Sequence, residues 1–424
     1  MKFAKLSLAA IMAMGIASAA NATDVKVDGS AKVFYGTNDA DAWTGALLPH
    51  PNGIQDNGKK DMGDMFGQHN SYANAAFRIG ITAEEMPADL TGRLSLTVLD
   101  TFGLEDSIVD DTWAGSGVGT SIWFDEANLK GTLFDQTTVI AGRQYLDTPM
   151  VFSEKWNIAS NSYDAAVVVD QHFEKTALVA AWVWRSNING AATVKGNDRI
   201  LAALGGTPSH ESAFDNYFDT FGKHGAYAFG AVTSLIPYTT AQAWYYSVDS
   251  VADAYWLQAD VKPTIGEDMN LEIGGQFAGT MVNKKNSDDA TVWAVKAGID
   301  LAGARVSAAY SSVDKGDLGF ANVGGAQSKL YTEAWWNYSY VSAPDTDAFN
   351  VTAEYKWADV ADFGAYYTST DSNGRNRDLT EFALTAGKSF GAFDTSLAYV
   401  YTDAEDQNNN DSYNTLQVYL TYNF

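Results

Sequence analysis

Apolar and polar residues alternate along most of the chain, and the closing nine residues give the clearest case. One face of this segment carries Leu416, Val418, Leu420, Tyr422 and Phe424. Gln417 and Thr421 lie on the opposite face. An apolar face that ends in aromatic residues is typical of a membrane-facing strand, because ring side chains settle at the lipid–water boundary. A soluble edge strand can end in the same way, so this segment alone leaves both interpretations open.

The same period of two recurs upstream, with charged residues of both signs at the centres of the predicted strands. In residues 293–300, for example, Trp293, Val295 and Ile299 alternate with Lys296 and Asp300. A soluble sandwich produces this alternation, and so does a barrel in lipid with its charged face turned to a water-filled lumen. The connections between the strands separate these two folds.

Short and long connections alternate along the chain. The short turns lie near residues 86–89, 133–136, 172–175, 235–238, 264–268, 302–303, 358–359 and 391–392. The longer segments lie near residues 37–69, 102–119, 144–163, 188–222, 248–252, 282–289, 314–346, 371–377 and 403–411. This rhythm predicts an all-β fold, a transmembrane antiparallel β-barrel of about 18 strands with short periplasmic turns and long extracellular loops.

The first residues have the composition of a secretory signal peptide. Lys2 and Lys5 precede an apolar run, and Ala20-Asn21-Ala22 forms a small-x-small cleavage site. We therefore expect a signal peptide over residues 1–22 and a single barrel domain over residues 23–424. No later segment has the 18 or more apolar residues of a membrane helix, so a spanning chain must close as a barrel. The first strand is expected at residues 25–35, which leaves no room for an N-terminal plug.

Composition agrees with an exported β-protein. The chain has no cysteine, which excludes a disulfide framework and a thiolate metal site. It has 22 Tyr, 21 Phe and 12 Trp, and its formal net charge is −25. The acidity is expected to raise the cation concentration at a pore mouth.

The third long loop is the best candidate for a constriction. It mixes apolar residues that can pack inside a barrel with the polar or amphipathic residues Asp147, Glu154, Lys155 and Trp156. An exposed loop needs no such apolar content, so we expect this loop to fold inward. The alternative is an extracellular loop that packs on itself. Loops 188–222 and 314–346 are also long enough to enter the lumen.

Strand parity assigns charged side chains of both signs to the lumen. The acidic ones are Glu126, Asp170, Asp260, Glu272, Asp300, Glu354, Asp362, Glu381 and Asp394. The basic ones are Arg78, Arg93, Lys130, Arg143, Lys262, Lys296, Arg305 and Lys356. The two sets nearly balance, so the net acidity lies mainly in loops and the expected cation preference is moderate.

The stretch AGRQYLDTPMVFSEKWNIASNSYDA (residues 141–165) resembles the Gly-Arg-Gln and Thr-Pro region of OprD-like porins. The N-terminal segment, the terminal Tyr-x-Phe and residues 330–355 are similar to the Campylobacter-type major outer membrane porins of that group. The resemblance implies a trimeric 18-stranded porin with an inward third loop, in which Arg143 and Gln144 match the family motif. The residues that give some members a basic amino-acid selectivity do not map onto this chain, so that selectivity is not transferred.

Three functions follow from these patterns: a passive diffusion porin, a substrate-selective nutrient channel, or a non-channel surface adhesin. The expected partners are outer-membrane lipid and lipopolysaccharide, small hydrophilic solutes, further copies in a homotrimer, and the barrel assembly machinery, which would read Tyr422 and Phe424. We expect no nucleic-acid partner, no enzymatic activity, no catalytic residue and no resident cofactor. The acidic pairs Asp39/Asp41, Glu105-Asp106, Asp110-Asp111 and Asp288-Asp289 suit either calcium or plain solvation. The five scattered histidines do not have zinc-site spacing.

Overall fold

The computed structural model describes most of the chain outside the N-terminus and several long loops. The described residues are 24–41, 63–104, 107–109, 121–187, 218–221, 224–266, 269–323, 325, 327–373 and 377–424. The predicted signal peptide, residues 1–22, lies outside them, as do parts of the predicted loops 37–69, 102–119 and 188–222. In the part of the chain that is described, no helix is long and apolar enough to cross a membrane.

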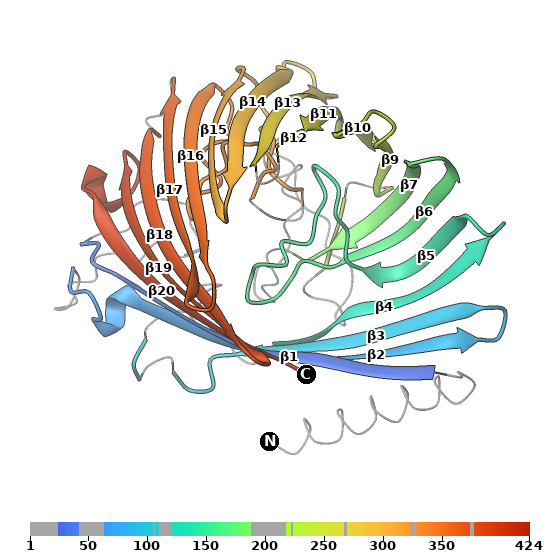
Figure 1. Cartoon of the computed structure of the whole chain (residues 1–424), viewed down its shortest axis with the longest axis horizontal. Coiled ribbons are helices and arrows are strands. Elements are labelled where there is room, and N and C mark those ends of the chain that lie inside the picture. The colour runs from blue at the N-terminus through green and yellow to red at the C-terminus, as the bar shows by residue number, and fades with distance from the viewer. Residues whose placement is uncertain are drawn as a thin grey trace.

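The described residues form a ring of 18 long antiparallel strands (Figure 1). They are β1 (Asp24–Asn38), β2 (Ser71–Met86), β3 (Leu90–Asp100), β4 (Ser121–Leu133), β5 (Thr137–Gln144), β6 (Tyr163–Phe173), β7 (Thr176–Ser186), β9 (Ala226–Thr233), β10 (Thr239–Val248), β11 (Ala252–Val261), β13 (Met269–Val282), β14 (Ala290–Leu301), β15 (Ala304–Val313), β16 (Thr346–Trp357), β17 (Ala361–Ser372), β18 (Leu379–Phe390), β19 (Phe393–Ala404) and β20 (Tyr413–Asn423). Two short strands, β8 (Asp219–Thr220) and β12 (Thr264–Ile265), extend the pairing of β7 and β13. The 3₁₀ turns are η1 (Gln68–Asn70) and η2 (Asn408–Asn410).

The barrel closes between its first and last strands. β1 pairs with β2 on one side and with β20 on the other, from Ser30 opposite Asn423 to Asn38 opposite Thr415. Gly29 and Phe424 also exchange backbone hydrogen bonds, with N–O distances of 2.8 and 3.0 Å. Closure leaves no unpaired edge in the ring of described strands, which is the condition for a sheet to cross a membrane. The predicted 18-stranded barrel is confirmed.

Alternate side chains form an apolar outer face. On β14, Trp293 and Val295 are exposed on the outside, whereas Lys296 lies on the opposite face. The closing strand follows the same parity, since Tyr422 is exposed and Gln417 is fully buried inside. Exposed large apolar residues recur on this face of most of the long strands, which matches a lipid-facing wall.

The short turns and the long loops lie at opposite ends of the strands, as predicted. The turn between β14 and β15 consists of Ala302 and Gly303, with φ angles of 52° and 83°. Two successive positive φ angles define the hairpin turn whose twist matches the flanking strands, and glycine is favoured there. Figure 1 also shows that the loop after β5 and the loop before β16 lie inside the ring of strands.

Candidate functional site

The loop after β5, residues 145–162, is called L3 here, and it folds into the lumen as predicted. Met150 and Val151 are buried against inward residues of the wall, including Tyr246 on β10. Tyr163, the first residue of β6, is fully buried and its hydroxyl donates to the Phe152 carbonyl at 2.8 Å. The apolar content of the loop therefore packs against the inside of the barrel.

A second loop, residues 314–345 before β16 and called L7 here, is hydrogen-bonded to L3. The Val323 amide donates to the Met150 carbonyl at 2.9 Å. Asn322 accepts from the Phe152 amide at 3.1 Å and donates to the Phe152 carbonyl at 2.8 Å. The length of loop 314–346 indicated that it could enter the lumen. The sequence did not indicate that this loop would bind L3.

Glu154 holds the two loops together. Its carboxylate is buried and accepts from the Asn322 amide group at 2.9 Å and from the Gln327 backbone N–H at 3.2 Å. A Cβ atom at Gly325 would lie 1.8 Å from the Glu154 carboxylate, so any other residue there would force the carboxylate to move. Glu154 thus stabilises the loop pair and is not a pore-surface charge.

The other three residues predicted for the constriction are more accessible. Asp147 is exposed and pairs with Lys329 of L7. The Lys155 ammonium lies 5.5 Å from the centre of the Tyr145 ring. Trp156 is 38 % exposed, donates to the Gln327 side chain at 2.8 Å and lies 5.6 Å from the Tyr338 ring. The contacts of Asp147 and Trp156 again join L3 to L7, whereas the contact of Lys155 lies within L3.

The wall formed by β1 to β4 carries a charge cluster centred on Arg78. Its guanidinium donates to Asp125 at 2.6 Å and to Asp28 at 3.1 Å, and it also pairs with Glu126. Arg93 donates to the same Glu126 at 3.0 Å and also pairs with Asp28. Two arginines and three carboxylates therefore form one ion-pair network across four adjacent strands, with one negative charge in excess.

A second cluster lies on β11 to β16, on the opposite side of the barrel from β2 and β3 (Figure 1). Glu272 is buried and pairs with Lys296 at 2.7 Å, Arg305 at 2.6 Å and Lys262 at 3.0 Å. The Tyr331 hydroxyl of L7 donates to Asp260 at 2.7 Å. Charged groups on this wall therefore also bind an inward loop.

The remaining predicted lumen charges are more scattered. Glu354 accepts from the Tyr366 hydroxyl at 3.0 Å. Asp170 accepts from the Thr137 hydroxyl at 2.6 Å near the short-turn end, but it pairs with the exposed Leu178 and lies on the outer face, not in the lumen as predicted. Lys130 is exposed on the inward face of β4, two residues from Asn128.

The position of Arg143 differs from the predicted one. Its neighbour Gln144 pairs with Tyr163, which faces inward, so Gln144 faces the lumen. Arg143 therefore lies on the outer face of β5, with Val139 and Ala141, and not on the lumen face. There it binds Asp164 at 2.7 Å and stacks on Phe218 with the guanidinium 3.6 Å from the ring centre. The family motif did not indicate which face of β5 carries Arg143, because that depends on the register of β5 against β6.

Sequence reasoning missed Asp125 because of a β-bulge. Ser95 pairs with Glu126 but Leu96 pairs with Phe124, so Asp125 is the extra residue and two successive carboxylates reach the Arg78 cluster. Strict alternation had assigned only Glu126 to the lumen. Asp28 lies on the same face of β1 as Lys26, so strand parity alone is enough to assign it to the lumen.

Glu381 anchors L7 to the wall at its other end. This buried β18 residue accepts from the Trp336 amide at 3.0 Å, the Asn337 amide at 2.7 Å and the Asn337 side chain at 2.8 Å. Asn337 in turn donates to Thr402 on β19 at 3.1 Å. A carboxylate that accepts several N–H bonds in a buried site is costly to remove, because the donors lose their partner.

Replacing Glu381 with alanine is expected to release L7 from the wall. Each stranded donor costs about 1–3 kcal/mol, which is enough to populate displaced loop conformations. Single-channel recordings should show greater open-channel noise, and added protease should cleave within L7. Asp394→Ala removes an exposed β19 carboxylate near a short turn and should change neither readout. If the Glu381→Ala channel shows no increase in open-channel noise and L7 resists the protease, Glu381 does not anchor L7.

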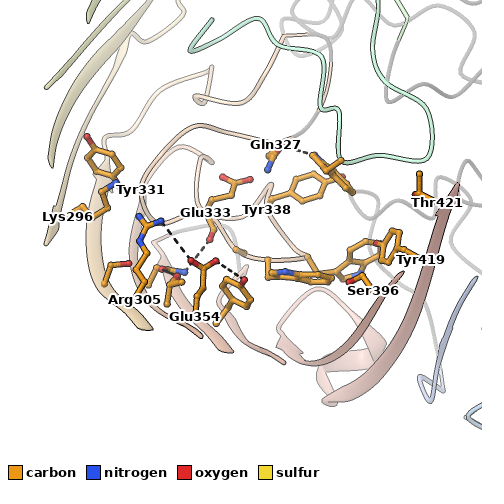
Figure 2. A pocket seen from close by; sticks show the side chains of 18 residues that line it. Lys296, Arg305, Gln327, Tyr331, Glu333, Tyr338, Glu354, Ser396, Tyr419 and Thr421 are labelled. Carbon is orange, nitrogen blue, oxygen red and sulfur yellow. Dashed lines mark hydrogen bonds and ion pairs between the residues drawn. The ribbon is translucent and has the colours of Figure 1, made fainter. Parts of the chain in front are cut away.

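A cavity of about 660 Å³ lies in the lumen between L7 and the wall from β14 to β20 (Figure 2). Lys296 and Arg305 line one side, and Tyr419 and Thr421 of β20 line the far side. Glu333 of L7 lies between them. Burial, together with Glu154 and Glu381 nearby, holds the pKa of the Glu333 carboxyl well above its usual range, although Ser328 donates to it.

Among the described residues, no group of three or more acidic or histidine side chains is arranged to hold a metal ion. Of the acidic pairs considered for calcium, Glu105-Asp106 and Asp110-Asp111 lie outside the described residues. Asp39 accepts from the Asn414 amide at 2.6 Å and its side chain at 2.8 Å. Calcium binding stays an untested prediction.

Comparison with protein-family models finds no match, and comparison with curated proteins finds no similar sequence. Solved structures, by contrast, match over nearly the whole chain. OccAB4 of Acinetobacter baumannii aligns with a TM-score of 0.71 and 12% identity, over 95% of this chain and 98% of its own. OccK3 (OpdO) of Pseudomonas aeruginosa gives 0.70 and 13%, over 97% and 98%. The outer membrane protein OpdK of the same species gives 0.69 and 11%, over 95% and 98%.

These structural neighbours are porins of the OprD/Occ group, so the suspected resemblance is confirmed at the level of the fold. At such low identity the likeness says nothing about which solute passes. The closed 18-stranded wall, its apolar outer face and these neighbours together support a location in the bacterial outer membrane. This chain is an outer-membrane β-barrel with the fold of OprD-like porins.

Proposed function

We propose that this protein is a passive channel for ions and small hydrophilic solutes, narrowed by L3 and L7 and moderately cation-preferring. The observation that carries the proposal is the pair of loops hydrogen-bonded to each other inside an 18-stranded barrel. A barrel of this size encloses an aqueous channel unless something fills it. Loops that enter the lumen narrow such a channel and give it a polar surface.

The cation preference rests on charge. The formal net charge of −25 surrounds the pore mouth with negative potential, whereas the two wall clusters largely neutralise themselves. The potential at the mouth is expected to enrich cations moderately. Salt should weaken this effect, because mobile ions screen exposed loop charges.

Planar-bilayer recording of the purified, folded protein is the direct test. We expect stepwise ion conductance and a reversal potential of cation-selective sign in a potassium chloride gradient. An anion-selective sign would refute the cation preference and leave the channel intact. Absence of steps from folded protein would refute the channel and favour a surface adhesin.

Further parts of the proposal concern export and assembly. We propose that residues 1–22 are cleaved on export, and that residues 23–424 form one barrel domain. Three copies would associate among lipid and lipopolysaccharide. The exposed aromatic residues Tyr422 and Phe424 at the closing seam are suited to recognition by the assembly machinery. Nothing in the proposed role requires a cofactor or a chemical step.

A further inference from the structure

Aromatic side chains cover one part of the lumen cavity. Trp335 of L7 lies 6.5 Å from Tyr366 of β17 and 6.4 Å from Trp336, measured between ring centres. Trp156 of L3 and Tyr338 of L7 form another ring pair at 5.6 Å. All five rings line the cavity, and Tyr419 continues them onto β20. A water-filled pore for ions alone needs no such concentration of rings.

The basic side chains of the cavity are already neutralised by carboxylates. Lys296 lies 2.7 Å from Glu272 and 3.7 Å from Asp260. Arg305 lies 2.6 Å from Glu272, and Asp300 and Glu354 approach it at 3.7 and 3.9 Å. Within the described lining, therefore, neither basic group stands unopposed to attract an anion.

Paired charges still supply hydrogen bonds. A guanidinium has five N–H donors and a carboxylate has several acceptor positions, so ion pairing does not exhaust either group. Asn350 and Thr352 on β16, together with Gln327 of L7, add neutral donors and acceptors. The Glu333 carboxyl, which accepts from the Ser328 amide, adds a further polar group between the charged side and the aromatic side (Figure 2).

We propose that this cavity binds a neutral, ring-shaped, polyhydroxylated solute, a short saccharide, as it passes through the channel. The apolar faces of sugar rings would stack on Trp335 and its neighbours, while the hydroxyl groups would bond to the opposite, charged side. The volume of about 660 Å³ lies within the range of small-molecule pockets. This inference rests on the proposed channel function and adds a solute class to it.

The test is single-channel recording in planar bilayers with maltotriose added as the probe. We expect maltotriose to reduce the ion current saturably. Trp335→Ala should weaken the apparent affinity by about five-fold, as expected for the loss of one aromatic stacking contact. Trp335→Phe should retain most of the affinity, because it keeps a ring. Trp293→Ala, which removes an exposed tryptophan on the outer face of β14, is the matched control and should behave as the unmodified protein.

Two charged probes complete the experiment. Sodium benzoate and arginine hydrochloride are added separately at the same concentrations. Saturable block by either one, without block by maltotriose, would overturn the saccharide assignment. An ion-conducting channel that maltotriose does not block would also overturn it, while the proposed channel function stands. An equal loss of affinity in Trp335→Ala and Trp293→Ala would show that Trp335 does not bind the sugar by stacking.

Discussion

Deletion of residues 148–158 from L3 is expected to raise the single-channel conductance on the order of twofold, because conductance follows the open cross-section of the narrowest region. The deletion removes Met150 and Phe152, which hydrogen-bond to L7, together with Glu154. L7 then loses its partner as well, so both inward loops should retreat. Planar-bilayer conductance at fixed salt measures the effect.

Shortening the exposed loop at residues 284–286 is the matched control for the L3 deletion. These residues are exposed between β13 and β14, so the pore should be unchanged. Glu154→Ala keeps the length of L3 and should give an intermediate conductance with frequent fluctuations. The deletion variant must still show the heat-modifiable gel migration of a folded barrel. If its conductance is unchanged, L3 does not form the constriction.

Replacing Arg78 with methionine is expected to destabilise the barrel by about 3 kcal/mol, because it leaves a buried carboxylate without its charged partner. The Asp125 side chain is 1 % exposed and binds Arg78 at 2.6 Å. Asp28 and Glu126 would also lose a partner, so the lumen becomes more negative. The unfolding midpoint should fall, and the reversal potential should shift toward stronger cation selectivity.

Lys130→Met provides the matched control for Arg78, since it removes one positive charge from β4 on the same wall. Lys130 is exposed, so this change should affect selectivity slightly and leave the unfolding midpoint in place. The double variant Arg78→Met/Asp125→Asn should recover part of the lost stability, because the uncompensated charge is gone. Failure of the double variant to recover stability would show that Arg78 acts through packing and not through charge.

The fold was largely predictable because its determinants are local. Alternation assigns Trp293 and Val295 to the outside and Lys296 to the inside from the order of three or four residues alone. Turn residues such as Ala302-Gly303 end one strand and begin the next within the same short segment. Eighteen strands follow from counting such segments, and the structure bears out the count.

The candidate site was only partly predictable. The apolar residues of L3 required a hydrophobic surface, and inside a barrel that surface can only be the inner wall, so the inward fold followed. The partner of L3 did not follow, because Asn322 lies 168 residues from Glu154 along the chain. The anchoring role of Glu381 was hidden for the same reason, since strand parity placed it in the lumen without naming the L7 amides.

Alternation, turn chemistry and composition act over short distances, so the sequence alone predicted export, a closed outer-membrane barrel and charges of both signs inside it. Which charges pair and which loops narrow the lumen became clear from the folded barrel alone. The bulge at Asp125 and the register at Arg143 each change the direction of a side chain, and both depend on the neighbouring strand. Contacts between L3, L7 and the wall join residues far apart in the chain, and no local pattern encodes such pairs.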